Sequence, residues 1–152
     1  MKVIISPDSF KGTMSSVDAA TTIEKALKQL SKTIETVCLP VADGGEGTLD
    51  ALVAATNGRF IETTVCNPIG REIKARYGVL GDGITCVIEM AQASGITLLS
   101  LEERNPLKAT TIGTGQLIEH ALRNGYRRFI IGIGGSATND AGLGMLHALG
   151  VK

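Results

Sequence analysis

The chain contains no tryptophan, and its other aromatic residues are only two tyrosines and three phenylalanines. A core must therefore be filled mainly by Val, Ile, Leu and Ala, and 43% apolar residues in a chain of 152 are enough for one compact α/β core. Neither sign of charge is in excess, since 15 basic side chains balance 15 acidic ones. This balance argues against nucleic acid or an anionic membrane surface as a partner. It indicates small-molecule partners or a second copy of the protein.

Cysteine is scarce as well. Cys38, Cys66 and Cys86 are an odd, widely spaced set without a CxxC pair, so neither a zinc site nor a redox pair is predicted. Each lies in an apolar run, which predicts three buried free thiols in a reducing compartment. No apolar run approaches the length of a membrane span, and the N-terminal one is too short for a signal-peptide core. We therefore expect a soluble, cytoplasmic chain with no membrane partner.

Two familiar phosphate-binding motifs are also missing. The sequence has no GxxxxGK[ST] segment and no kinase-type glycine-rich loop followed by a strand lysine. If the protein uses ATP, a different arrangement must bind it.

Glycine, in contrast, is abundant. The 19 glycines exceed the average share of about 7%, and many gather with small and acidic residues in four segments: SPDSFKG (6–12), ADGGEG (42–47), TTIGTG (110–115) and IGGSATND (133–140). Each segment precedes a stretch of helical character, so its backbone N–H groups can face an anion. This layout is typical of an enzyme that handles phosphate.

The first part of the chain alternates between strand and helix patterns. The pattern predicts a strand buried on both faces at Lys2–Ile5, a helix capped by Ser15 or Ser16, a strand at 36–41 and a helix at 48–55 that ends at Asn57-Gly58. Such a β-α-β-α order favours a parallel sheet.

Between residues 59 and 102 the pattern changes to β-rich runs at 60–65, 72–79 and 84–90, the last two joined by the hairpin signal Gly81-Asp82-Gly83. A helix at 115–123, a strand at 128–133 and a helix at 141–149 then resume the alternation. We predict an α/β fold with an open, mostly parallel sheet and flanking helices, formed by residues 1–58 and 103–152 as a discontinuous, incomplete domain. Residues 59–102 are predicted to be an inserted, antiparallel, β-rich subdomain.

Five long segments resemble a known family. VIISPDSFKGTMSS, LPVADGGEGTLDALVAA, GVLGDGITCVIEMAQASG, RNPLKATTIGTGQLI and IIGIGGSATNDAGLGMLHALG are similar to successive signature segments of the bacterial glycerate kinases that phosphorylate D-glycerate on its 2-hydroxyl. The resemblance runs from Met1 to Gly150, whereas members of that family are more than twice as long. It implies that D-glycerate and ATP meet in a cleft between two α/β lobes, with Mg²⁺ bridging the phosphates, and that the chain represents the N-terminal portion.

Phosphoryl transfer requires that the phosphates be held, their charge neutralised and the attacking hydroxyl positioned. Carboxylates at the ends of the predicted strands suit these tasks, because Mg²⁺ prefers oxygen ligands. With the resemblance, this predicts Asp43, Asp8 and Lys11 as catalytic residues and Glu46 and Asp140 as metal ligands. The predicted substrate- or nucleotide-binding residues are Ser9, Gly44, Gly45, Thr111, Gly113, Thr114, Gly134, Gly135, Ser136, Thr138 and Asn139. Glu89 and Ser94 are weaker candidates.

Other interpretations stay open at this point. Asp8 and Asp43 are compatible with ordinary turns, Glu46 with a favourable charge at a helix N-terminus, and Thr110–Thr114 with a helix cap. Residues 132–137 fit the loose dinucleotide pattern GxGxxA, which would suit an NAD(P)-dependent oxidoreductase. A non-catalytic ligand-binding fragment and a homodimer are further possibilities.

Overall fold

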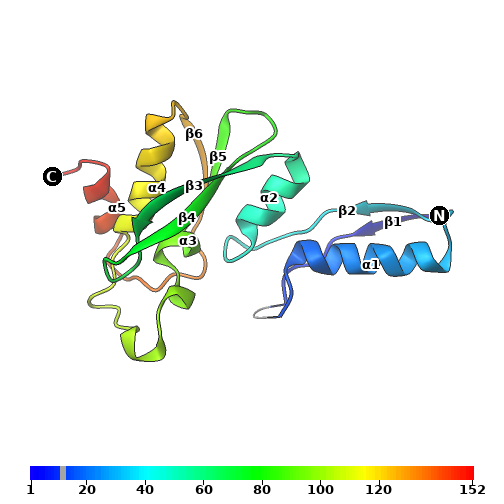
Figure 1. The fold of residues 1–152 in the computed structure, drawn as a ribbon, viewed down its shortest axis with the longest axis horizontal. Helices are drawn as coiled ribbons and strands as arrows, with labels where there is room; N and C mark the ends of the chain where they lie inside the picture. The colour runs from blue at the N-terminus through cyan, green and yellow to red at the C-terminus, as the bar shows by residue number, and fades with distance from the viewer. Residues whose placement is uncertain (11–12) are drawn as a thin grey trace.

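The structure is a computed structural model that describes residues 1–10 and 13–152. The strands are β1 (Lys2–Ile5), β2 (Glu35–Cys38), β3 (Arg59–Cys66), β4 (Glu72–Val79), β5 (Thr85–Glu89) and β6 (Arg128–Gly132). The α-helices are α1 (Ser16–Leu30), α2 (Thr48–Thr56), α3 (Ala91–Ser94), α4 (Ile112–Arg123) and α5 (Leu143–Ala148). Two short 3-10 turns, at Ile96–Leu98 and Leu101–Glu103, lie between α3 and α4. Figure 1 shows an elongated molecule, with β1, α1 and β2 at one end and the remaining elements at the other.

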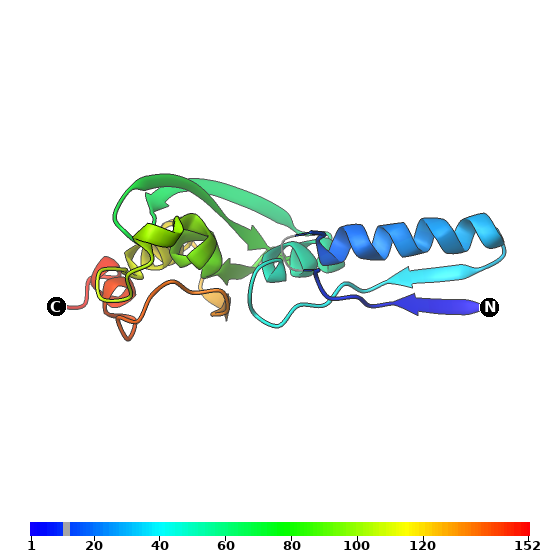
Figure 2. The ribbon, with the colours of Figure 1, turned by 90° about the horizontal axis from the view of Figure 1, so that it is seen from below.

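The N-terminal end of the molecule is a two-stranded sheet covered by one helix. β1 and β2 pair in parallel, as predicted, with Lys2 opposite Glu35 and Ile5 opposite Cys38. α1 lies along one side of this pair (Figure 2). It begins as the sequence indicates, because the Ser15 hydroxyl oxygen accepts a hydrogen bond from the Asp18 N–H at 3.0 Å.

The prediction that Lys2–Ile5 is buried on both faces is wrong. Ile5 is buried, but the side chain of Ile4 is 63% exposed. Successive residues of a strand point to opposite faces, and α1 covers only one face of the pair. The other face of this small sheet is therefore open in the described residues.

The second sheet has the strand order β3-β4-β5-β6. β3 and β4 are antiparallel, and so are β4 and β5, as predicted from the turn at Gly81–Gly83. β6 was expected to extend the sheet of the first two strands, and this expectation is wrong. It pairs in parallel with β5, with Glu89 opposite Gly132. The chain passes through α4 between β5 and β6, so the β-rich run and the later α/β segment share one sheet. The predicted domain boundaries stay a prediction.

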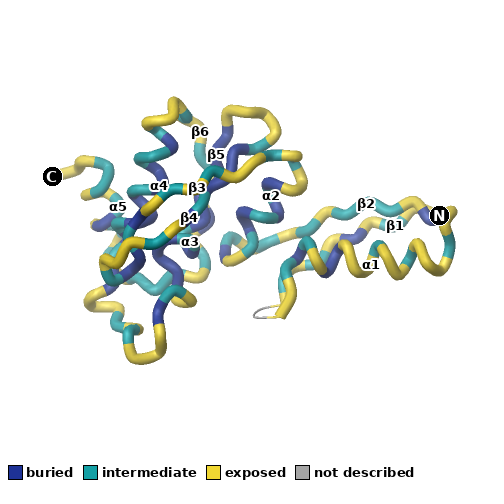
Figure 3. Tube along the Cα trace, in the orientation of Figure 1, coloured by how far each residue is buried: buried dark blue, intermediate teal, exposed yellow. Residues whose placement is uncertain are grey.

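The core lies on both faces of this four-stranded sheet. Tyr77 of β4 and Ile88 of β5 pack with Leu117 of α4 on one face, and all three are fully buried. Val87 points to the opposite face, where it contacts Leu49 and Val53 of α2. Figure 3 shows this buried interior and the largely exposed surface of α1. The sheet thus positions the N-termini of α2 and α4 near the ends of β5 and β6.

The three thiols are free, as predicted. Cys86 is fully buried, and this burial raises the pKa of its thiol to about 11. Cys38 and Cys66 are only half-buried, so the prediction of burial holds for Cys86 alone. In the described ranges, no helix combines the length and the apolar character that crossing a bilayer requires.

Candidate functional site

The first two glycine-rich segments leave neighbouring strands. Beyond the end of β1, the Ser6 hydroxyl donates to the Leu39 carbonyl at 2.8 Å, and the Val41 N–H donates to the Pro7 carbonyl at 3.1 Å. The two predicted catalytic carboxylates, Asp8 and Asp43, therefore follow adjacent, hydrogen-bonded stretches of chain. Asp8 is exposed and accepts a hydrogen bond from the Ser9 N–H at 2.6 Å. The third predicted catalytic residue, Lys11, lies outside the described residues.

The segment at 42–47 is in direct contact with the segment at 133–140. The Gly134 N–H donates to the Gly44 carbonyl at 2.8 Å. A Cβ atom on Gly134 would lie 2.6 Å from the Gly45 Cα, and one on Gly132 would lie 2.7 Å from the Gly44 carbonyl oxygen. Such distances are too short for any side chain, so glycine is required for the two backbones to approach. The tertiary structure therefore joins two of the four predicted segments, which are 90 residues apart in the sequence.

Asp43 lies at the surface of this contact. Its Oδ1 accepts a hydrogen bond from the Gly45 N–H at 3.1 Å, and the Gly44 N–H donates to the Thr48 hydroxyl at 3.1 Å. Gly44 has φ of +94°, a backbone conformation that residues with a side chain rarely adopt. Among the described residues, the Asp43 Oδ2 makes no hydrogen bond. One carboxylate oxygen of Asp43 is therefore available to a ligand.

Glu89 lies beneath this loop, at the end of β5, and is only 1% exposed. Its Oε2 accepts a hydrogen bond from the Leu49 N–H at 2.9 Å, in the first turn of α2. Burial raises the pKa of this carboxyl, while the amides of Leu49 and Gly47 and the side chain of Gln92 partly offset that rise. Glu89 was only a weak candidate in the sequence. The signal in the sequence is an acid that directly follows the apolar residues Cys86, Val87 and Ile88, and the structure shows that the whole strand is buried.

The loop after β6 is anchored by the segment after β5. The Ile96 N–H donates to the Gly135 carbonyl and the Ala137 N–H to the Ser94 carbonyl, both at 2.9 Å. Across the same contact, the Thr97 hydroxyl donates to the Glu46 Oε1 at 2.7 Å. This network holds the 42–47 and 133–140 segments in one place.

The polar residues of the 133–140 segment are mostly engaged with each other. The hydroxyls of Ser136 and Thr138 lie 2.8 Å apart, and the Thr138 N–H donates to the Ser136 hydroxyl. Asn139 is exposed, and its side chain makes no hydrogen bond with the described residues. Asn139 is therefore the side chain of this loop that is most open to a ligand.

Asp140 connects the N-terminal ends of two helices. Its carboxylate accepts hydrogen bonds from the Thr111 N–H and hydroxyl, both at 2.8 Å, at the start of α4. It also accepts the N–H groups of Gly142 and Gly144, both at 3.1 Å, at the start of α5. Burial opposes ionisation of Asp140, but these hydrogen bonds outweigh it and hold the pKa of the carboxyl below its usual range. The segments at 110–115 and 133–140 are thus also in contact.

The other predicted binding residues at the start of α4 face the interior. Thr111, Gly113 and Thr114 are all buried, and the Thr114 hydroxyl lies 2.7 Å from that of Ser94. The Thr111 hydroxyl accepts a hydrogen bond from the Met145 N–H at 2.9 Å. In this structure these residues join elements to one another, and their predicted contact with a ligand stays a prediction.

The described residues do not by themselves fit a magnesium site. No group of three His, Cys, Asp or Glu side chains among them is arranged around a common point. Both oxygens of Asp140 already accept hydrogen bonds from the protein, and Glu46 is bonded to Thr97. The metal-binding roles predicted for Glu46 and Asp140 therefore stay predictions.

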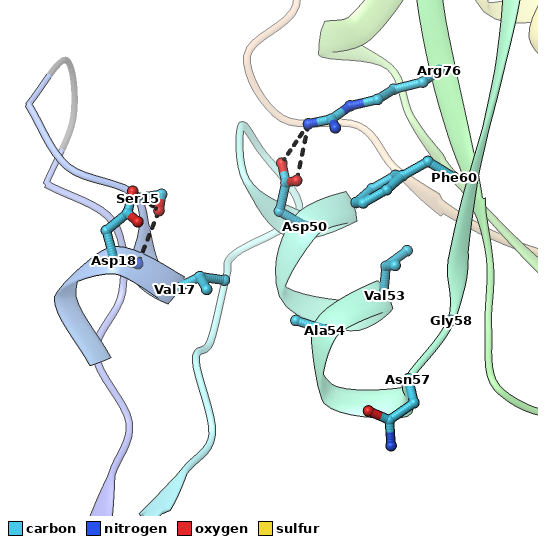
Figure 4. A pocket seen from close by; sticks show the side chains of 10 residues that line it. All are labelled: Ser15, Val17, Asp18, Asp50, Val53, Ala54, Asn57, Gly58, Phe60 and Arg76. Atoms are coloured by element: carbon cyan, nitrogen blue, oxygen red, sulfur yellow. Dashed lines mark hydrogen bonds and ion pairs between the residues drawn. The ribbon is translucent and has the colours of Figure 1, made fainter. Parts of the chain in front are cut away.

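A groove of about 630 Å³ lies elsewhere, between the start of α1, α2 and the β3–β4 strands (Figure 4). Inside it, Arg76 forms an ion pair with Asp50 at 2.9 Å, and its guanidinium lies 4.3 Å from the centre of the Phe60 ring. None of the predicted site residues lines this groove. The glycine-rich contact and the groove are two different places on the molecule.

The loop at 132–137 does not have the surroundings that the dinucleotide motif requires. In that motif a helix opens within the glycine pattern and presents its N-terminus to the pyrophosphate. Here the chain after β6 continues as an irregular loop to α5, which begins only at Leu143. The Gly134 N–H, moreover, is bonded to Gly44. This geometry gives no support to an oxidoreductase.

Comparison with known proteins agrees with the sequence resemblance. Residues 3–152 match the model of the Glycerate kinase family. The chain is 56% identical over 150 residues to a glycerate kinase of Bacillus subtilis (strain 168), covering 99% of this chain and 39% of that protein. It is 49% identical over 152 residues to the glycerate 2-kinase of Escherichia coli (strain K12), covering 100% of this chain and 40% of that protein.

A solved structure gives the same result for the fold. A crystal structure assigned to glycerate kinase 2 from Salmonella typhimurium LT2 superposes with a TM-score of 0.86 at 49% identity, covering 99% of this chain and 40% of that one. The chain thus spans about 40% of the length of the relatives it matches.

Proposed function

Because this chain belongs to the glycerate kinase family, we propose that it contributes the glycine-rich half of an active site that transfers the γ-phosphoryl group of ATP to D-glycerate. The favoured acceptor is the 2-hydroxyl, which would give 2-phosphoglycerate. A relative that is 49% identical is named a glycerate 2-kinase, which supports this choice of hydroxyl. The chain spans about 40% of the length of such relatives, so the proposal concerns the full-length protein.

One observation carries this proposal. Two segments from different parts of the chain, 42–47 and 133–140, meet with glycine backbones in contact and with the Asp43 carboxylate exposed beside them. Backbone groups without side chains let a phosphate approach closely, and a carboxylate next to them can act on a hydroxyl. The contact therefore offers two of the three things that phosphoryl transfer needs from a protein, a place for the phosphates and a group that positions the hydroxyl.

In the proposed reaction, Asp43 orients the glycerate hydroxyl and takes its proton. Its Oδ1 is held by the Gly45 N–H, while its Oδ2 has no hydrogen bond among the described residues. As the hydroxyl oxygen bonds to the γ-phosphorus, the bond from that phosphorus to the β–γ bridging oxygen breaks and ADP leaves. Asp8 is the alternative base, because it follows the adjacent stretch of chain. Lys11 is assigned to negative charge on substrate or phosphate by the family resemblance alone.

The experiment compares this chain with a version extended to the family's full length. ADP release would be measured with D-glycerate and ATP, and the phosphoglycerate isomer identified by NMR. We expect glycerate-dependent ADP release from the longer protein only. Absence of that release from the full-length protein would contradict the proposal.

A second candidate, a ligand-binding chain without activity of its own, is favoured by the same 40% coverage. Calorimetric titration of the 152-residue chain with D-glycerate and with ATP would test it. Binding without ADP release would support this candidate for the chain by itself.

A further inference from the structure

Glu89 differs from the other carboxylates of the site because it is almost completely buried. It is 1% exposed and stands at the last position of β5, where its backbone lies opposite Gly132. Its Oε2 accepts the Leu49 N–H at 2.9 Å, and its Oε1 lies 3.3 Å from the amide nitrogen of Gln92. Burying a carboxylate costs free energy unless it is hydrogen-bonded, so the groups that bond to Glu89 indicate what the residue does.

The first turn of α2 has no cap of its own. The residue that precedes the helix is Gly47, which has φ of +89° and no side chain to accept the free N–H groups. Glu89 supplies this acceptor from a strand that is 40 residues away in the sequence. When ionised, this carboxylate also interacts favourably with the positive end of the helix dipole.

Glu89 thereby lies between the elements that lead into the two glycine-rich segments. On one side it binds the start of α2, and residues 42–47 lead directly into that helix. On the other side, the N–H of the next residue, Met90, donates to the Gly132 carbonyl at 2.9 Å, and Gly132 leads into the 133–140 segment. A displacement of Glu89 would move both sides of the contact on which Asp43 lies.

We propose that Glu89 is a positioning residue for the loop at 42–47: its buried carboxylate fixes the N-terminus of α2 and so holds Asp43, Gly44 and Gly45 in place for the reaction. This inference rests on the proposed phosphoryl transfer for its catalytic consequence. It rests on the Leu49 and Gly132 contacts for its structural one.

A consequence concerns where a phosphate can bind. From the sequence, the helix after ADGGEG was expected to present its N-terminus to an anion. That end already holds an anion of the same chain, because Glu89 occupies the Leu49 N–H. A ligand phosphate therefore cannot use the Leu49 N–H, and we expect it to contact the loop at 42–47 instead.

The first test measures amide hydrogen exchange in the full-length protein. Glu89→Gln keeps the shape and one acceptor oxygen but removes the charge, whereas Glu89→Ala removes the acceptor altogether. We expect exchange at Leu49 and at residues 44–47 to become about tenfold faster in the Ala variant, with a smaller increase in the Gln variant. If exchange there matches the unsubstituted protein in both variants, the proposal is wrong.

The second test separates positioning from stability. At a temperature well below unfolding, we expect Glu89→Gln to lower kcat about tenfold, while KM for glycerate and ATP changes less than about twofold. If Glu89 were merely structural, the folded Gln variant would keep its kcat even if its melting temperature fell. Unchanged kcat would therefore overturn the proposal.

Asp82→Asn is the matched control. Asp82 precedes β5, at the end of the strand opposite to Glu89 and to the glycine-rich contact. Its carboxylate accepts hydrogen bonds from the N–H groups of Ile84 and Thr85 at 3.0 and 2.9 Å. It should leave exchange at residues 44–49 and kcat unchanged. Should the unsubstituted full-length protein lack glycerate-dependent ADP release, the proposed function would fail, whereas hydrogen exchange would still decide the placement of Glu89.

Discussion

Asp43 and Asp140 stand in segments of similar composition, but the structure uses them in opposite ways. The carboxylate of Asp140 accepts five hydrogen bonds of 2.8 to 3.4 Å from Thr110, Thr111, Gly142 and Gly144. Asp43 is exposed and accepts one, from the Gly45 N–H at 3.1 Å. Asp140 is therefore a structural connection between two helices. Asp43 keeps an oxygen with which to act on a ligand.

This difference shows how much a carboxylate's role depends on the donors around it. When the protein's own N–H and hydroxyl groups surround the charge, the charge stabilises the fold and little of it is left for chemistry. When one oxygen stays open, the same group can accept a proton. The following predictions test whether the two positions are as distinct as their surroundings indicate.

The largest effect is expected for Asp43→Asn in the full-length protein. An amide cannot take the hydroxyl proton, so kcat should fall about 100- to 10,000-fold, while KM changes little. Steady-state ADP release measures both. Glu35→Gln is the control, because Glu35 is an exposed carboxylate whose ion-pair partner among the described residues is Lys2 alone. Full turnover in the Asp43→Asn protein would remove Asp43 from the mechanism.

The opposite result is expected for Asp140→Asn, which should act first on stability. An amide cannot accept all five hydrogen bonds, and each donor left without a partner costs about 1–3 kcal/mol. We expect the free energy of unfolding to fall by about 2–4 kcal/mol, measured by urea denaturation. A variant as stable as the unsubstituted chain would contradict the structural role.

The effect of Asp140→Asn should also depend on pH. Hydrogen bonds hold the pKa of Asp140 in the folded protein below its usual range, so the folded state favours the ionised form. This stabilisation is present above the unfolded pKa of about 3.9 and is lost as the pH falls through the lower, folded value. The stability difference between the two proteins should therefore be full at pH 7 and decrease below about pH 4.

A smaller effect is expected where the two segments meet. Gly134→Ala would place a Cβ 2.6 Å from the Gly45 Cα, so a backbone must move, at a cost of about 1–3 kcal/mol. Gly45→Ala is the matched substitution from the other side, where the nearest atom is the Asp43 side-chain oxygen at 3.2 Å. Thermal unfolding should rank Gly134→Ala as clearly the more destabilising, and equal losses would argue against the close approach.

The smallest effect is expected at the groove of Figure 4. Asp50 and Arg76 form an ion pair at 2.9 Å with 34% and 39% of their side chains exposed. A double-mutant cycle with Asp50→Asn and Arg76→Gln should give a coupling energy below about 1 kcal/mol that decreases with added salt. Neither substitution should change kcat, because the groove is separate from the glycine-rich contact. A fall in kcat would instead connect the groove with the reaction.

Local structure was largely predictable from the sequence. The cap at Ser15, the left-handed end of α2 at Asn57 and the hairpin at Gly81–Gly83 all depend on neighbouring residues, and all are found. The partner of β6 was predicted wrongly, because an apolar run in the sequence does not specify which strand it will pair with. The importance of Glu89 was also underestimated, since its partner Leu49 is 40 residues away.

The order of the amino acids thus determined the family of this protein, the course of its strands and helices, and the four segments in which polar chemistry is concentrated. Only the tertiary structure decided which segments touch, which carboxylate is surrounded by donors and which stays open. The physical reason is range, because propensities, caps and turns act over a few residues. Thr111, which lies 29 residues before Asp140, and Gly134, which meets Gly45 beside Asp43, are brought to these carboxylates only by the packing of the sheet.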